Sequence, residues 1–480
     1  MLVPGNSIVA SMPLPAITRM GEASRVCALF PPAPPLTALL ARAVLGRRCR
    51  PRDGSGWRCP PEPPGCAAAG ARPAYGWNGR GRAMTWGTVA DWAELLVRWT
   101  HVIAGIAWIG SSFYFIALDA SLQPHPRLDP RVKGEAWQVH GGGFYQMQKF
   151  TVAPDYLPEH LTWFKWEAYS TWIFGFLLLI LLYYVNPNFY LIDRSVLDLS
   201  PLAAVAIGVV SLAVGWLIYD LLCKSRVGRN TLRLAVVGFV LLVVAAYGYT
   251  HVFSGRGAFV HIGALVGSIM VGNVLFVIIP NQTVAVRELI AGRTPDPKLG
   301  AEAKQRSVHN NYLTLPVVFV MLSNHSAFTY GTRWSWAVLA AVFIASFLVR
   351  HWFNTKHTGA KPAWWLWPAA AVPMFLAAVL TVLGQPGAQA GAGTVKFAEV
   401  QQIVATRCAV CHAAKPTFDG VEEAPKGVML DTPERIVTLA PRIFAQAVQT
   451  NTMPLGNLTN ITDAERGTLA AWIQQGAPGP

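Results

Sequence analysis

The apolar and polar positions divide the chain into a long apolar middle and two ends of different character. Runs of about 20 apolar residues, the length at which a helix crosses a hydrocarbon core of about 30 Å, recur along the middle of the sequence. They lie at residues 92–118, 168–186, 200–222, 231–250, 258–280, 312–330, 335–352 and 364–384. This pattern predicts an all-α fold, a polytopic transmembrane bundle of about eight spans within residues 84–384.

The C-terminal end has the pattern of a small soluble α domain. An amphipathic segment, VKFAEVQQIVATR, begins at residue 395, and Thr462 followed by Glu465 is a capping-box signature for a last helix. Residues 385–394 are rich in Gly and Ala, which is typical of a flexible linker. We therefore expect a separate domain at residues 395–480.

Composition supports a membrane as the solvent of the middle part. The chain is 53% apolar and only 13% charged, too few charges to coat a soluble surface of this size. The formal charge is +14, but residues 1–83 hold eleven Arg, no Lys and three acidic residues, so this irregular leader supplies +8 of it. The remaining charge is not a concentrated basic patch, and we expect no nucleic-acid partner.

The placement of Lys and Arg predicts the orientation of the bundle. Cationic loops stay on the cytoplasmic side, and the loops after the first, third, fifth and seventh runs are the cationic ones. Arg350, Lys356 and Lys361 are counted with the loop after the seventh run. Both chain ends are therefore expected in the periplasm of a bacterium, with the bundle in its inner membrane.

The arginine-rich leader contradicts this orientation. Met84 begins a sequence that runs straight into the first apolar run, so we expect residues 1–83 to be a disordered, mis-assigned start rather than translated protein. A secretory or transit peptide is the alternative. It is disfavoured because the leader lacks a basic region followed by a clean apolar region.

The C-terminal domain carries a haem attachment motif. In Cys408-Ala-Val-Cys411-His412, two thiols can add to the haem vinyl groups and the imidazole of His412 can bind the iron. A zinc site or a thioredoxin-like pair is disfavoured by the adjacent histidine, by the absence of a βαβ pattern and by the lack of a second ligand pair. The motif predicts one covalent haem c.

The second axial ligand of the iron is expected to be a methionine. Met453 lies in Asn-Thr-Met-Pro-Leu-Gly, just before the last predicted helix, as in the methionine loop of class I cytochromes c. Met429 is the other candidate, and we interpret it as packing against the porphyrin or the core. We predict that His412 and Met453 hold the iron.

Four histidines fall in or beside the apolar runs. Ionisable residues inside a bilayer are costly and are functional candidates by default. The predicted topology places His101, His261, His325 and His251 in the outer half, on the side of the haem domain. We interpret the first three as candidate bases or ligands of a b-type haem or metal, and His251 as a packing residue. No HExxH and no haem-copper pattern is present, so reduction of oxygen within the bundle is not expected.

Amide side chains at the start of the sixth run allow two interpretations. Asn310 and Asn311 offer donors and acceptors that suit a planar ligand carrying several amide groups, but such side chains also hold helices together. We favour the helix-packing interpretation for both.

From Met84 to Pro480 the chain resembles the membrane-bound, cytochrome-c-linked urate hydroxylases of bacteria, also called integral membrane urate oxidases. The resemblance rests on RWTHVIAGIAWIGSSFY at residues 98–114, EAWQVHGGGFY at 135–145, SVHNNY at 307–312 and the fused CAVCH at 408–412. The haem motif alone is shared by many families. The combination of the haem motif with the apolar runs and the segment at residues 98–114 is more specific for this family.

The resemblance implies an oxidoreductase of purine catabolism that converts urate to 5-hydroxyisourate with water as the oxygen source. Its electrons would pass to the fused haem c and then to an external cytochrome c or a terminal oxidase. The family assigns no catalytic residue that we can carry over, so His101, His261 and His325 remain candidates from topology.

A rival function is also consistent with the sequence. The first-run motif is similar to that of small membrane proteins in which such a histidine binds haem b, so an additional haem b or metal stays open. The bundle could then be a non-catalytic, quinol-linked electron carrier that feeds the cytochrome domain. A transporter is less favoured because inverted repeats and broken-helix signals are absent.

Overall fold

The computed structural model describes residues 50–52, 56–58, 86–356, 358, 361, 363–385 and 394–480. The chain divides into two compact units, Met1–Arg82 and Ala83–Pro480. In the first unit, β1 (Arg50–Arg52) and β2 (Gly56–Arg58) pair antiparallel. The remainder of the predicted leader, and most of the predicted linker at 385–394, lies outside the described residues.

The described part is mostly helical, and its long helices follow the predicted apolar runs. They are α3 (Trp86–Ser121), α4 (Trp166–Leu179) with η1 (Ile180–Tyr184), α6 (Pro201–Lys224), α7 (Thr231–Thr250), α8 (Gly255–Asn273) with η3 (Val274–Ile278) and α9 (Ile279–Ile290), α10 (Pro297–Ser323), α12 (Ser335–Lys356) and α13 (Leu366–Leu383). Local signals define several starts. Ser200, Asn230 and Ser254 are N-caps whose side chains accept a hydrogen bond from the backbone N–H three residues on.

Seven helical segments in the described part are long and apolar enough to cross a membrane. The sixth predicted run, 312–330, is not among them, because α10 begins at Pro297 and its first half carries charged and amide side chains. Nor does the helix continue to residue 330. It ends at Ser323, and the short α11 (Ala327–Tyr330) follows a turn. The count of eight spans stays a prediction.

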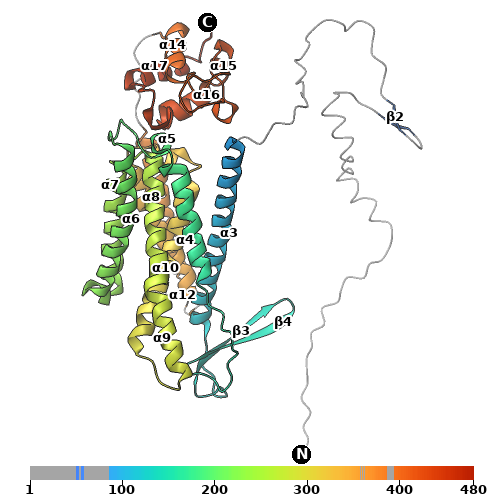
Figure 1. Ribbon diagram of the computed structural model, residues 1–480, viewed down its shortest axis with the longest axis vertical. Helices are drawn as coiled ribbons and strands as arrows, with labels where there is room; N and C mark the ends of the chain where they lie inside the picture. The colour runs from blue at the N-terminus through green and yellow to red at the C-terminus, as the bar shows by residue number, and fades with distance from the viewer. Residues whose placement is uncertain are drawn as a thin grey trace, which may run out of the picture. The chain divides into compact units, whose positions relative to one another are not determined.

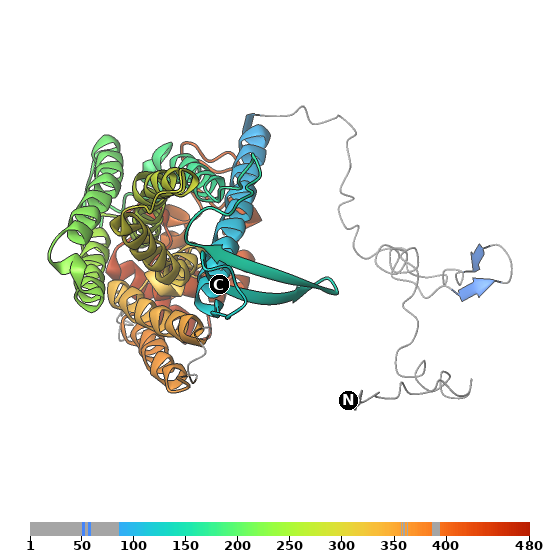
Figure 2. The ribbon, with the colours of Figure 1, turned by 90° about the horizontal axis from the view of Figure 1, so that it is seen from below.

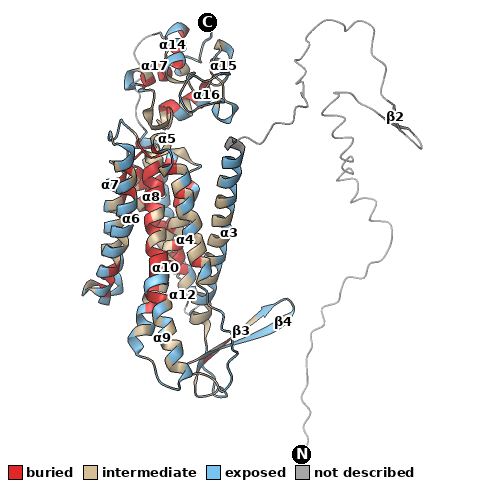
Figure 3. Ribbon diagram, viewed as in Figure 1, coloured by how far each residue is buried: buried red, intermediate tan, exposed pale blue. Residues whose placement is uncertain are grey.

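Helices α8 and α10 form the centre of the bundle. Helix α8 contacts α4, α6, α7 and α10, while α10 also contacts α3 and α12. Phe259 and Ile262 of α8 are fully buried. The view along the helices shows α6 and α7 at one edge and α3 at the opposite edge (Figure 2). Burial is concentrated along α8, whereas α3, α6 and α7 are largely exposed in the absence of lipid (Figure 3).

The segment between α3 and α4, expected as a loop, is a β-hairpin. Strands β3 (Val132–His140) and β4 (Gly143–Phe150) pair antiparallel, with His140 opposite Gly143. Gly141 and Gly142 form the turn with φ of 59° and 79°, a conformation that glycine adopts without strain. The prediction of an all-α fold misses this hairpin, although three glycines between two aromatic-rich runs were a readable turn signal.

The C-terminal segment folds into a small helical domain. Its helices are α14 (Phe397–Arg407), α15 (Pro433–Thr438), α16 (Ala440–Ile443) with η5 (Phe444–Gln449), and α17 (Asp463–Gln474); short turns are η4 (Pro425–Gly427) and η6 (Leu455–Asn457). Val400, Val404, Leu469 and Trp472 pack in its core with no exposed surface. Both the amphipathic first helix and the Thr462–Glu465 capping box are confirmed.

The C-terminal domain contacts the bundle through the loop that follows Met453. Turn η6 packs against α5 (Pro187–Tyr190). Helix α5 follows the end of η1 and lies at one end of the bundle (Figure 1). Gly456 has a φ of 53°, and a Cβ at this position would lie 2.5 Å from the carbonyl oxygen of Ile192. The backbone approach therefore requires glycine there.

Candidate functional site

The predicted haem ligand His412 is held in the orientation that iron binding requires. Cys408 caps α14, and the backbone N–H groups of Cys411 and His412 both donate to its carbonyl oxygen. The Nδ1 atom of His412 lies 2.9 Å from the carbonyl oxygen of Val428. A carbonyl can only accept, so Nδ1 carries the proton and Nε2 is left as the basic nitrogen, as in metal-binding histidines. The donor set therefore fits covalent haem c.

The two thiols have raised rather than lowered pKa values. Burial raises the pKa of the Cys408 thiol to about 12 and also raises that of Cys411. Thioredoxin-like and zinc-binding thiols have lowered pKa values, because the thiolate is the reactive form. This pair therefore differs from a thioredoxin-like pair.

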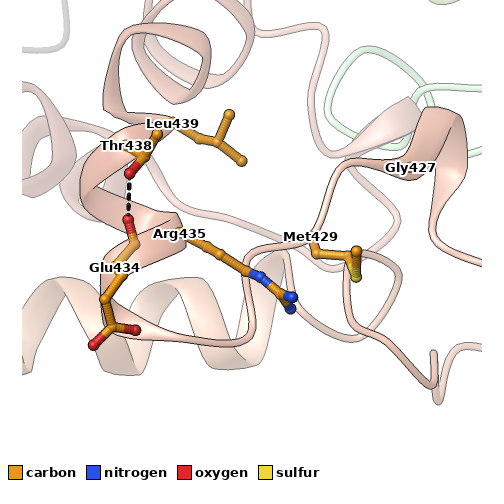
Figure 4. Close-up of a pocket in the computed structure, with 6 residues that line it drawn as sticks. All are labelled: Gly427, Met429, Glu434, Arg435, Thr438 and Leu439. Atoms are coloured by element: carbon orange, nitrogen blue, oxygen red, sulfur yellow. Dashed lines mark hydrogen bonds between the residues drawn. The ribbon is translucent and has the colours of Figure 1, made fainter. Parts of the chain in front are cut away.

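The two methionine candidates differ in their position relative to His412. Met429 follows Val428, whose carbonyl oxygen lies next to Nδ1 of His412. This segment is therefore on the Nδ1 side of the imidazole, away from Nε2, the nitrogen that would bind iron. Met429 lines a surface pocket of about 290 Å³ with Arg435, and the motif cysteines are absent from its lining (Figure 4). Met453 lies in another loop, anchored by the buried Arg466, which donates to its carbonyl oxygen at 2.9 Å. Met453 as the second ligand stays a prediction.

A substitution pair tests this assignment. We expect Met453→His to lower the reduction potential of the haem by roughly 0.1 V or more, because a thioether ligand raises the potential relative to a second imidazole. Met429→Leu should leave the potential unchanged. Redox titration of the purified full-length protein measures both. A drop in Met429→Leu alone would assign the ligand to Met429 instead.

His261 is fully buried among aromatic side chains, and both of its ring nitrogens have partners. Nδ1 lies 2.8 Å from the carbonyl oxygen of Gly257, and Nε2 lies 3.0 Å from the hydroxyl of Tyr184. A Cβ at Gly208 of α6 would come within 2.7 Å of both Nε2 and that hydroxyl. The site is thus closed and tightly packed, which is the geometry of a helix-packing histidine.

His101 has one ring nitrogen without a protein partner. On α3, its Nδ1 lies 2.9 Å from the carbonyl oxygen of Thr171, so Nδ1 donates, and Nε2 makes no hydrogen bond to a described residue. Gly175 leaves room for the ring, since a Cβ there would lie 2.7 Å from the ring carbon Cε1. A half-buried imidazole with a fixed tautomer and a free basic nitrogen suits a base or an iron ligand.

The three candidate histidines do not form one site. His101 and His261 contact α4 and η1 at Thr171 and Tyr184, 13 positions apart, which is about 20 Å along a helix. His325, expected within a span, lies instead in the exposed turn after α10, because that helix ends two residues earlier. In the described residues, no three His, Cys, Asp or Glu side chains are grouped to hold a metal ion.

A buried polar network that sequence reasoning did not assemble joins α6, α8 and α10. Its members are Tyr219, Asp220, Asn273, Arg306, His309 and Asn310. Arg306 pairs with Asp220 at 2.7 Å, and both are buried. Asn310 accepts from Asn273 at 2.9 Å and donates to the carbonyl oxygen of Met270. This geometry agrees with the helix-packing interpretation of Asn310.

A second polar group, which we name the Arg350 cluster, consists of Phe113, Asn311, Arg350 and Asn354. Arg350 was counted with the loop cations, but it lies inside α12 and only 6% of it is exposed. Its Nε donates to Asn311 Oδ1 at 2.8 Å, and the Phe113 ring centroid lies 3.6 Å from the guanidinium carbon. Asn311 had been singled out from the sequence, but a lone arginine at a helix end gave no signal of burial.

Comparison with known families identifies the bundle. A family model described as "Urate oxidase N-terminal" matches residues 87–381, more than half of the chain. Searches of curated proteins and of solved structures return no match.

Proposed function

The chain belongs to the urate oxidase N-terminal family, a family of urate-related oxidoreductases, and from this premise we propose that residues 84–480 form a membrane-bound, cytochrome-c-linked urate hydroxylase. The reaction would be urate plus water to 5-hydroxyisourate, with release of two protons and two electrons. The observation that carries the proposal is a haem attachment motif with a correctly oriented His412 in the same chain as the family domain.

Bound haem c would supply a one-electron acceptor, held by thioethers from Cys408 and Cys411 and by His412 and Met453. Other residues of the chain would orient these ligands. Val428 fixes the tautomer of His412, and Arg466 anchors the Met453 loop. Because the Met453 loop also contacts α5, the acceptor would lie next to the end of the bundle.

The seven apolar helices are compatible with a membrane protein, and the cationic loops support a location in the bacterial inner membrane with the cytochrome domain in the periplasm. An external cytochrome c or a terminal oxidase would then receive the electrons. Of the three candidate histidines, His101 has the free nitrogen that suits a base or a ligand of an additional haem b. The closed packing of His261 and the exposure of His325 give these two residues weaker support.

The test is anaerobic mixing of membranes that contain the protein with urate, following haem c reduction and urate loss together. We expect haem c to become reduced as urate disappears, in the absence of oxygen. If haem c stays oxidised with urate but is reduced by a quinol, the enzyme proposal fails. The bundle is then a non-catalytic electron carrier that feeds the cytochrome domain.

A further inference from the structure

Arg350 is a buried cation without an ionic partner. It forms no ion pair with any carboxylate in the part of the chain that the structure describes, and its two terminal nitrogens have no hydrogen-bond acceptor there. Arg306, the comparable arginine of the neighbouring network, is paired with Asp220. An uncompensated charge inside a bundle is costly and is retained where a ligand or partner supplies the opposite charge. Arg350 therefore lacks an anion.

The amides beside Arg350 also have unused hydrogen-bonding atoms, and their orientation follows from the arginine. Because Arg350 Nε can only donate, the atom 2.8 Å from it is the oxygen of Asn311. The same oxygen accepts from Asn354 Nδ2 at 2.9 Å. Asn311 Nδ2 and Asn354 Oδ1 are then left buried without a partner. One donor and one acceptor thus remain beside an unpaired cation.

The remaining surroundings restrict the shape of a ligand. The Phe113 ring covers one face of the guanidinium, so a ligand meets the planar edge of that group. Arg350 and Asn354 are four residues apart on α12 and point to the same side of the helix. Asn311 is fully buried, whereas Phe113 and Asn354 are half-buried, so a ligand would approach from the side of these two residues.

We propose that the Arg350 cluster binds a planar, anionic oxopurine, and, resting on the proposed function, that this ligand is the urate anion. An oxopurine ring presents adjacent N–H and C=O groups, which match the free amide acceptor and donor, and its negative charge pairs with the guanidinium. The phosphodiester of a lipid headgroup offers only acceptors and leaves Asn354 Oδ1 unpaired, and inorganic phosphate, which keeps an O–H donor at neutral pH, is tetrahedral rather than planar.

The Arg350 cluster is separate from His101, the histidine whose ring contacts α4. Phe113 lies twelve residues after His101 on α3, which is about 18 Å along the helix axis. His101 therefore does not contact urate in this proposal. It lies between the substrate and the cytochrome domain.

Binding without turnover provides the test. The full-length protein is reduced with dithionite so that it cannot accept electrons, and the binding of radiolabelled urate is measured by equilibrium dialysis. Arg350→Met should weaken binding by roughly 10-fold to 100-fold, because it removes charge-assisted hydrogen bonds. Asn354→Asp should weaken it at least as much, since the new carboxylate pairs with Arg350 and repels the anion. Asn230→Asp, which retains the N-cap of α7, is the matched control and should bind as the wild type does.

Thermal unfolding without urate separates a binding role from a structural one. Neither Arg350→Met nor Asn354→Asp should lower the Tm, because each relieves the unpaired cation. The inference is overturned if these variants bind urate normally, or if phosphate or anionic lipid displaces urate at equal concentration. In either case the proposed function still stands when urate reduces haem c in the wild type. If urate neither binds nor reduces haem c, the proposed function fails and the identification of the ligand as urate fails with it.

Discussion

Replacing Cys408 and Cys411 together with serine is expected to abolish covalent haem attachment and, with it, urate-dependent electron transfer. A hydroxyl cannot replace the thiol in the thioether bonds, and both thiols lie at the end of α14 next to His412. We expect haem staining of the protein on a denaturing gel to vanish completely, and anaerobic urate consumption to fall to the level of membranes without the protein.

Cys223→Ser is the control for this experiment. Cys223 is a buried free thiol near the end of α6, in the bundle rather than in the C-terminal domain. Haem staining should be unchanged in this variant. Covalent haem that persists in the Cys408 and Cys411 double variant would show that the motif does not attach the group.

The second large effect is a contrast between His101 and His261. His101→Ala should lower urate turnover per haem c by about 100-fold or more, because the free Nε2 atom that suits binding of an additional haem iron, and with it electron transfer through the bundle, is lost. His261→Ala should instead lower the free energy of unfolding by about 2–5 kcal/mol, because it opens a cavity among aromatic rings and leaves the Tyr184 hydroxyl without its acceptor.

Three measurements separate these roles. Turnover per haem c should remain near the wild-type value in the His261→Ala protein that folds, and its thermal unfolding should shift. His101→Gly should regain activity when imidazole is added, since the added ring can occupy the vacated space beside Gly175. Normal turnover in His101→Ala would remove His101 from the mechanism. Loss of turnover without loss of stability in His261→Ala would place it there instead.

The sequence by itself determined the features that depend on short stretches of chain. Seven of the eight predicted apolar runs match long apolar helical segments, because hydropathy and helix length are local properties. Six of them agree within about four residues at each end, whereas the segment Gly255–Ile290 continues beyond the predicted end at residue 280. The haem motif is also local, because it is contained in five consecutive residues, and the capping box from Thr462 to Glu465 is contained in four. The all-α prediction missed the β-hairpin, although its turn signal at the three consecutive glycines is equally local.

Tertiary structure alone decided which side chains meet. Hydropathy places His101 and His261 at a depth in a span, but it does not give the rotation of each helix, which is set by small residues and polar pairs at helix contacts. Gly208 admits the closed packing of His261, and Gly175 admits the ring of His101. The rotations of α10 and α12 bring Asn311 and Arg350 together, and no carboxylate of the described residues pairs with Arg350. A missing counter-charge is a property of three-dimensional surroundings that no local pattern encodes.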